Sequence, residues 1–398
     1  MKRKISMVFA LLIGVVFFSY GQSDDKKVSV KFSGFVKVDY MFDSRQTVNA
    51  REGHFLLFPA AEKFVDGEDV NDQINFNILA VQTRLRTKFT GPDFFGMKTS
   101  GMVEGAFFGH TNSDINGFRL RHAFVKLSND NIDIYMGQYW HPMFVTAVFP
   151  GTYSFNTGVP FQPFSRNPQL RIETKGTVKF IGVMFSERDF ASRGPIGITS
   201  KYVRDAGIPQ LHAQIQFGDK SHLLGGFGIN MKTMRPVLGE DNITNMAYIG
   251  YFRTKLGNVT WKGEATYGEN MSDLLSIGAI GEMGNGDFTA SKTTSLWTEF
   301  SGDISESTEW GLFGGYTENG GFQDAVTGNM YGLGTTISNA YRVSPRIGWK
   351  SGNMKIGVEG EYTSALYGSL GADKKSIVTD GVDNVSNIRL SVSAIYNF

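Results

Sequence analysis

The side chains best suited to act on a solute are arginines spaced two residues apart in stretches that alternate polar and apolar residues. Arg84 and Arg86 share one phase of such a stretch, and Arg119 and Arg121 repeat the spacing further along. A guanidinium group donates hydrogen bonds in a planar fork that matches carboxylate and phosphate oxygens. Such groups gathered around one passage would favour anions. The candidates for a solute pathway are Arg84, Arg86, Arg119, Arg121, Arg166 and Arg171.

A structural role is the alternative for these arginines, because charges on one face of a sheet often pair with each other and only hold its shape. Arg346 is expected opposite or diagonal to Glu359, and Arg342 near Glu361, as ordinary cross-strand pairs. Acidic residues are fewer around Arg84. We therefore expect the six candidate arginines to face solute, and Arg342 and Arg346 to hold the sheet in shape.

Catalytic and cofactor chemistry has little support in the sequence. The six histidines are scattered without the His-Glu-x-x-His spacing of a zinc site, and there is no cysteine. His110 and Ser113 share one predicted loop, but nothing else marks a catalytic triad. We predict that the chain is not an enzyme and has no catalytic residue, metal site or cofactor. A hydrolase or protease and a structural or adhesin protein remain as alternatives.

The composition limits the class of protein. A net charge of +1 and 19% charged residues give no overall basic field for nucleic acid. A hydrophobic content of 41% and an aromatic content of 13% argue against disorder, so a large apolar surface must be buried or covered.

A period of two in hydrophobicity identifies the elements that position the arginines. Apolar residues occupy alternate positions across 28–43 and again across 388–398. Such segments exceed the ~5 to 6 residues usual in soluble strands and suit the ~9 to 11 that a tilted strand needs to cross a bilayer. Because lipid offers no hydrogen-bond partner, a spanning sheet must close on itself. The predicted fold class is all-β, a transmembrane antiparallel β-barrel with a water-filled lumen.

The connections give a strand count, because tight turns and long loops alternate in a bacterial barrel. Short turns are expected at 91–93, 128–131, 175–176, 218–220, 256–258, 302–303 and 351–353. Long loops are expected near 44–72, 111–117, 140–168, 187–208, 233–243, 271–291, 319–338 and 365–385. This pattern predicts about sixteen strands, with eighteen as the alternative. The short alternating stretch 198–203 is assigned to a loop or to an extension of its neighbour.

The third long loop, 141–168, differs from the others because it contains five prolines and many aromatic residues but few charges. Water is a poor solvent for such a segment, so we expect it to fold into the barrel and narrow the pore. A subunit contact or a hydrophobic rim near the outer leaflet is the alternative. Its candidate constriction residues are Tyr153, Phe155, Asn156, Phe161 and Phe164.

Both ends of the chain carry targeting signals. Residues 1–21 combine a basic start, an apolar run of about fourteen residues and small residues at a cleavage position, which predicts a secretory signal peptide. The remaining 22–398 are expected to form a single outer-membrane β-barrel domain. Tyr396 and Phe398 end the last alternating segment, as expected of the signal that the barrel assembly machinery recognises.

Three motifs carry a family resemblance. Gly137-Gln138-Tyr139-Trp140, the Phe155-Asn156-Thr157-Gly158 segment and the return Arg166-Asn167-Pro168-Gln169-Leu170-Arg171 resemble the strand end, constriction loop and loop return of the DcaP-like outer membrane porins. The resemblance is specific over 80–172. It implies a homotrimer with a narrow, positively charged eyelet that passes small anions, including dicarboxylates. By motif position it makes Arg166 and Arg171 eyelet candidates, with Arg119 and Arg121 behind them.

The expected function is passive diffusion of small hydrophilic solutes across the outer membrane, with a preference for anions such as small carboxylates. The expected partners are these solutes, outer-membrane lipid and lipopolysaccharide, the barrel assembly machinery and two further copies of the chain. No nucleic-acid partner is expected.

Overall fold

The computed structural model describes residues 28–155, 158–284 and 286–398. The predicted signal peptide, 1–21, and Asn156 of the predicted constriction loop lie outside these residues. No helix within the described ranges is long and apolar enough to cross a membrane.

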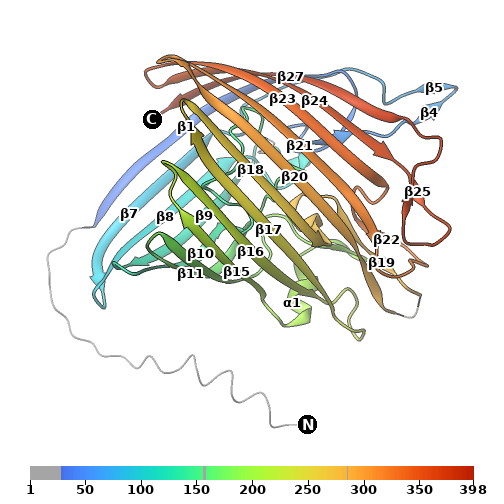
Figure 1. Cartoon of the computed structure of the whole chain (residues 1–398), viewed down its shortest axis with the longest axis horizontal. Coiled ribbons are helices and arrows are strands. Elements are labelled where there is room, and N and C mark those ends of the chain that lie inside the picture. Colours follow the sequence, from blue (N-terminus) through green and yellow to red (C-terminus); the bar gives the residue numbers. More distant parts are fainter. Residues whose placement is uncertain (1–27, 156–157, 285) are drawn as a thin grey trace, which may run out of the picture.

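In the described part of the chain, sixteen antiparallel strands close into one barrel (Figure 1). The last strand pairs with the first from Phe35↔Asn397 to Asp43↔Arg389, which closes the sheet. β6 and β7 both pair with β1 and together form one interrupted strand. The wall consists in order of β1 (Ser29–Asp43), β6 (Asn75–Leu79) with β7 (Arg84–Phe94), β8 (Met97–Phe107), β9 (Phe118–Ser128), β10 (Ile132–Trp140), β11 (Arg166–Thr174), β12 (Val178–Phe185), β15 (Gln210–Gly218), β16 (Leu223–Met234), β17 (Ile243–Leu256), β18 (Val259–Glu269), β20 (Phe288–Ser305), β21 (Thr308–Phe322), β23 (Ile337–Ser351), β24 (Met354–Tyr367) and β27 (Asn384–Asn397). The predicted fold class and strand count are confirmed.

The alternation of the sequence places apolar side chains on the outside of this wall. Along β1, Phe32, Val36 and Tyr40 are exposed, whereas Lys37 and Asp39 are buried. A soluble domain has the reverse arrangement, because water solvates charges and excludes apolar surface. The barrel is therefore apolar on the face that lipid would cover and polar around its lumen.

Short and long connections alternate over the described residues, as expected, and separate the two ends of the barrel. Seven turns of two to four residues lie at one end of the barrel, here called the turn end, together with the start of β1 and the end of β27. The other, here called the loop end, carries eight loops: L1 (44–74), L2 (108–117), L3 (141–165), L4 (186–209), L5 (235–242), L6 (270–287), L7 (323–336) and L8 (368–383). Figure 1 shows the small elements β4, β5, β19, β22, β25 and α1 gathered at the loop end.

The stretch 198–203 lies within L4, as expected. The loops contain the remaining short elements. These elements are β2 (Thr47–Ala50), β3 (Phe55–Pro59), β4 (Phe64–Val65), β5 (Glu68–Asp69), η1 (Asn112–Asp114), β13 (Arg193–Gly194), β14 (Gly197–Ile198), α1 (Lys201–Ala206), η2 (Met271–Leu274), β19 (Gly278–Glu282), β22 (Met330–Leu333), β25 (Ser369–Leu370) and β26 (Ile377–Val378).

Two predicted turns were wrong. Pro92 lies where the β7–β8 register shifts, an irregularity that accommodates a residue without an N–H, and the turn follows at Phe95 and Gly96, both with positive φ. Gly302 lies inside β20, where a Cβ would meet the carbonyl oxygen of Asn258 at 2.7 Å. The turn comes at 306–307. Pro92 thus marks a bulge, and Gly302 marks a close approach of two backbones, rather than a turn.

L3 folds into the barrel, as predicted, and crosses the lumen to reach strands far from its origin between β10 and β11. Its backbone bonds Glu299 of β20 through the Gly151 N–H (2.6 Å), Lys262 of β18 through the Phe149 carbonyl (3.0 Å) and Arg342 of β23 through the Val159 carbonyl (2.8 Å). The predicted constriction residues Tyr153, Phe155, Phe161 and Phe164 are all buried.

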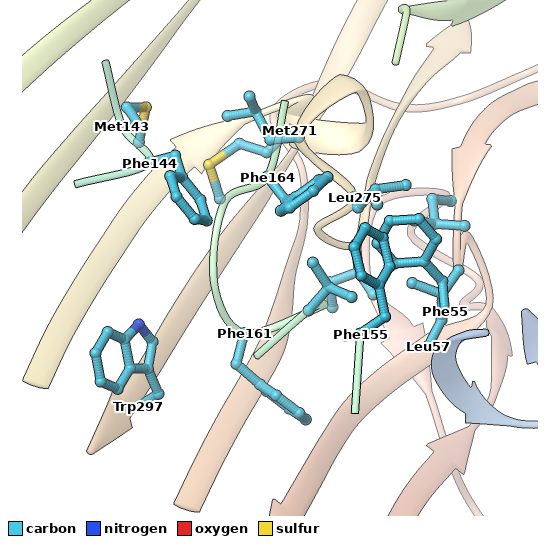
Figure 2. Packing of buried hydrophobic residues seen from close by; sticks show 14 of the residues in the cluster. Phe55, Leu57, Met143, Phe144, Phe155, Phe161, Phe164, Met271, Leu275 and Trp297 are labelled. Atoms are coloured by element: carbon cyan, nitrogen blue, oxygen red, sulfur yellow. The ribbon is translucent and has the colours of Figure 1, made fainter. Parts of the chain in front are cut away.

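The apolar core of the molecule lies inside the barrel, where several loops meet. Figure 2 shows Phe55 and Leu57 of L1 close to Phe155 of L3, with Leu275 of L6 nearby. The core thus fills part of the loop end, and the polar lumen lies between this core and the turn end.

Candidate functional site

Arg84, Arg86 and Arg121 meet around one carboxylate, that of Glu104 on β8. The Nε atoms of Arg86 and Arg121 donate to Glu104 at 2.7 and 2.9 Å, and Arg84 Nε lies 3.5 Å from the same carboxylate. Strand pairing brings them together, because Arg86 lies directly opposite Glu104 and His122 of β9 lies opposite it on the other side. One buried carboxylate cannot neutralise three guanidinium groups, so this cluster has an excess of positive charge.

Arg119 and Arg166 form a second cluster with Asp189 of L4. Arg119 Nη2 lies 2.6 Å from one carboxylate oxygen, and Arg166 Nε donates to the other at 2.7 Å. Burial alone would raise the pKa of Asp189, but Arg166 and Arg119 outweigh it and lower the pKa to about 2. Asp189 is therefore ionised at neutral pH and ties L4 to the barrel wall.

The two clusters together hold five guanidinium groups against two carboxylates, a formal excess of three positive charges. Exposure separates their members. Arg119 and Arg166 are 2% and 0% exposed, and Arg121 is 1% exposed. The side chains of Arg84 and Arg86 are 14% and 34% exposed. All five arginines, which were expected to face solute, are thus paired with a carboxylate. Arg84 and Arg86 are the two most open to water.

Aromatic rings hold these guanidinium groups in place. Arg84 lies 4.9 Å from the ring centroid of Phe35, and Arg121 and Arg166 lie 5.8 and 5.2 Å from that of Trp140. Cations over ring faces are attracted by the ring quadrupole. Trp140 ends the Gly137-Gln138-Tyr139-Trp140 motif, so this motif supplies the seat of two arginines.

Arg171 does not join the other five. It pairs with Glu173 on its own strand and lies 5.8 Å from the ring centroid of Tyr139. It lines a cavity of about 620 Å³ at the turn end, together with Lys179 and Lys220. The structure therefore places this eyelet candidate nearer the turn end than the rest.

A cavity of about 530 Å³ lies between L3 and the wall formed by β1, β7, β9 and β10. L3 contributes 149–155 to it, including Tyr153. Among the described residues that line this cavity, the ionisable ones besides Tyr153 are all cationic: Lys37, Arg84, Arg121 and Lys355. Lys37 also pairs with Asp39 at 3.1 Å and Lys355 with Glu309, but neither carboxylate lines the cavity. Four cations on the surface of a water-accessible space favour anions there.

A third cavity of about 660 Å³ extends from Gly151 of L3 to the turn at 257–258. Here Lys262 and Arg346 both contact Glu299, at 2.5 and 3.0 Å. The predicted partner of Arg346 was Glu359, which lies opposite it in register, but the ion pair goes to Glu299 on β20. Arg342 lies 3.6 Å from Glu361, as expected. Most of the charged side chains that line this cavity are therefore paired with each other.

Sequence reasoning missed three contributors to the site. Lys37 and Lys355 were visible as inward residues of alternating strands, but their distance in sequence from Arg84 hid their proximity. Asp189 belongs to a loop whose path depends on the whole barrel, and no local pattern marks it. L1 also folds inward, and its one signal is the apolar run 55–58 in an otherwise polar loop.

The residues singled out for the enzyme alternative do not form a catalytic pair. The Ser113 hydroxyl bonds the Thr111 hydroxyl at 2.9 Å, and the backbone of His110 bonds Asp114. Both pairs lie on the exposed surface of L2. This geometry gives a hydroxyl no activating base.

The C-terminal residues complete the wall. The Phe398 N–H and carbonyl both bond the backbone of Gly34, at 3.1 and 3.0 Å, and a Cβ at Gly34 would meet the Phe398 ring at 2.8 Å. Tyr396 and Phe398 are 50% and 53% exposed on the outside of the barrel. Their role as an assembly signal stays a prediction.

Comparison with solved structures shows the same barrel fold in outer-membrane proteins. The chain superimposes on the outer membrane channel DcaP of Acinetobacter baumannii with a TM-score of 0.72 at 17% identity, covering 96% of this chain and 100% of that one. An anion-selective porin from Comamonas acidovorans gives a TM-score of 0.57 at 12% identity over 94% and 100% of the two chains. The trimer form of OmpT, an outer membrane protein of Vibrio cholerae, gives 0.56 at 12% over 93% and 99%. No protein-family model and no curated protein matches the sequence.

Proposed function

We propose that this chain is an outer-membrane porin through which small hydrophilic solutes diffuse passively, with a preference for anions such as small carboxylates. The observation that carries the proposal is the cavity between L3 and the wall, which Lys37, Arg84, Arg121 and Lys355 line. Passive diffusion needs only an aqueous path, and selectivity then follows from the charge along it.

Each arginine has its own part in this proposal. Arg84 and Arg86 meet the solute directly, and Arg121 adds charge at the edge of the cavity. Arg119 and Arg166 are covered, so they act through their field and by holding L4. Arg171 lies further along the path, at the turn end. The constriction itself is L3, with Tyr153 and Phe155 on the cavity side.

The surroundings of the barrel are part of the proposal. An export signal at 1–21, an outward apolar wall and a C-terminal aromatic segment suit assembly into the outer membrane, in contact with lipid and lipopolysaccharide. The turn end then faces the periplasm and the loop end faces outside. We propose a homotrimer, which the recorded trimer form of OmpT supports. The names of DcaP as a channel and of the Comamonas porin as anion-selective support the transport role.

Liposome swelling tests the anion preference with solutes of matched size and different charge. Purified protein in vesicles should admit a sugar acid faster than the neutral sugar, and the neutral sugar faster than the amino sugar. Arg84→Gln and Arg121→Gln should reduce the ratio of anion to neutral rates several-fold, because each removes a cation from the cavity surface. Lys63→Gln, which removes the same charge from an exposed site in L1, is the matched control. Equal rates for all three solutes in the wild type would overturn the proposal.

A further inference from the structure

L1 sends a hairpin into the barrel. β2 and β3 pair only with each other and form a separate two-stranded sheet. The residues of β3 from Phe55 to Phe58 are 0–3% exposed. The second hairpin of the same loop, β4–β5, is exposed at Phe64 and Val65. One loop thus has an inserted half and an outer half.

Phe55 is the centre of an aromatic cluster that joins four loops. Its ring centroid lies 5.4 Å from that of Phe108 in L2, 4.7 and 5.4 Å from those of Phe155 and Phe164 in L3, and 5.7 Å from that of Phe190 in L4. Figure 2 shows Phe55 with Phe155 and Phe164. The edge-to-face arrangement of these rings is the favoured one. The cluster therefore joins L1 to L3 across the barrel, and the ring of His54 stacks on Phe155 at its edge.

This cluster stands between the cation-lined cavity and the loop end. Phe155 and Phe164 form one side of that cavity, and its other side reaches Ile395 and Asn397 near the turn end. An anion in the cavity thus has a polar path toward the turn end and an apolar barrier toward the loop end. An apolar constriction loses its water and blocks ions.

Polar contacts hold the hairpin in place from the wall. Arg389 Nη1 donates to the Gly53 carbonyl at 2.7 Å, and Arg342 Nη2 donates to the carbonyls of Leu56 and Leu57 at 3.1 and 3.0 Å. His54 Nε2 lies 2.8 Å from Asp39. All of these partners are side chains of the wall, and in the described part of the chain no strand of the wall pairs with the hairpin. The hairpin can therefore leave without breaking the barrel sheet.

We infer that the β2–β3 hairpin of L1 is a plug that closes the pore at its loop end and withdraws to let solutes pass. The inference rests on the proposed function, because a plug has meaning only for a channel. It adds a closed state and an open state that differ in the position of 47–59. The arginine clusters set which ions pass, and the hairpin sets when they pass.

Single-channel recording in planar bilayers tests the plug with the full chain. Replacing two of its apolar side chains, in the double variant Phe55→Ser and Leu57→Ser, should raise the time-averaged conductance several-fold, because polar side chains let water into the constriction. The matched control is Phe64→Ser with Val65→Ser in the outer hairpin of the same loop, which should conduct like the wild type. Wild-type conductance in the plug variant, with its β-sheet content retained by circular dichroism, would overturn the inference.

A cysteine probe tests the movement even if the serine variant fails to fold. The natural sequence has no cysteine, so Leu57→Cys introduces one thiol at a position that is 3% exposed. A charged methanethiosulfonate reagent added at the loop end should react slowly, in proportion to the open time, and should leave the pore conducting permanently. Complete protection over hours, or instant reaction with no change in current, would each overturn the plug. The sign of ion selectivity, measured separately in the wild type, tests the proposed function independently.

Discussion

At the scale of single residues, the site is controlled by a shortage of carboxylates. Glu104 and Asp189 keep five arginines in place and leave them a net positive charge. The sequence was sufficient to predict that Arg84, Arg86 and Arg121 share one face of the sheet, because they belong to neighbouring strands of one meander. Their role in a solute pathway stays a prediction. The sequence was insufficient for Asp189, because the path of L4 depends on contacts made after the barrel closes.

Glu104→Gln should change selectivity and stability in opposite senses. Removing the shared negative charge leaves three guanidinium groups near the cavity without a counter-ion, so anion preference should rise. Breaking buried ion pairs costs about 3–5 kcal/mol, so the folded barrel should be less stable by roughly that amount. Reversal potentials and urea unfolding in detergent measure the two effects. Glu62→Gln, which removes an exposed acid from L1, is the control. Lower anion preference in Glu104→Gln would contradict this role.

At the scale of elements, the loops rather than the strands distinguish this barrel. Strand alternation and turn residues were readable from the sequence, although Pro92 and Gly302 misled the placement of two turns. The inward path of L3 was readable from its prolines and aromatic residues. The inserted hairpin of L1 was not recognised, because its apolar run is only four residues long and resembles a strand fragment. Its position depends on Arg342 and Arg389, which lie 286 and 336 residues along the chain from the carbonyls that they bind.

The seat of the L1 hairpin should respond to pH through His54. Burial lowers the pKa of His54 below its ordinary value, although Asp39 acts to raise it; Lys37 and Arg389 lower it further. The imidazole is therefore neutral when the hairpin is seated and takes up a proton when it is released. As the pH falls below about 6.5, the ordinary histidine value, the released state is favoured. Open probability should rise between about pH 7.5 and about pH 5, a range around that value. His54→Gln should abolish the rise. An unchanged pH response in that variant would contradict this role of His54 in holding the hairpin.

At the scale of the whole molecule, the barrel reverses the usual arrangement of a folded protein. Apolar side chains such as Leu296 are exposed on the wall, and charged ones such as Glu299 on the same strand are buried. The sequence predicted this reversal through period-two alternation alone, because the wall repeats one rule sixteen times. The contacts between distant loops follow no such rule, which is why the fold was more predictable than the site.

An arginine on the outer wall should be costly only where lipid covers it. Leu296→Arg, in the middle of β20, should destabilise the barrel in phospholipid by about 2–4 kcal/mol, as expected for a cation near the bilayer midplane. Val382→Arg, in L8, places the same charge at an exposed apolar site outside the wall and should cost little. Equilibrium unfolding of both variants in vesicles gives the comparison. Equal stability of the two would show that lipid does not cover β20.

The central claim is an aqueous passage through this barrel whose surface charge is positive, and the zero-current potential across a planar bilayer tests it most directly. With purified wild-type protein and a KCl gradient, chloride should carry more current than potassium, so the potential should take the sign of anion selectivity. The potential should shrink at high ionic strength, where screening shortens the reach of the charges to a few ångströms. A membrane that stays non-conducting with folded protein inserted, or a potential of the cation-selective sign, would contradict the account.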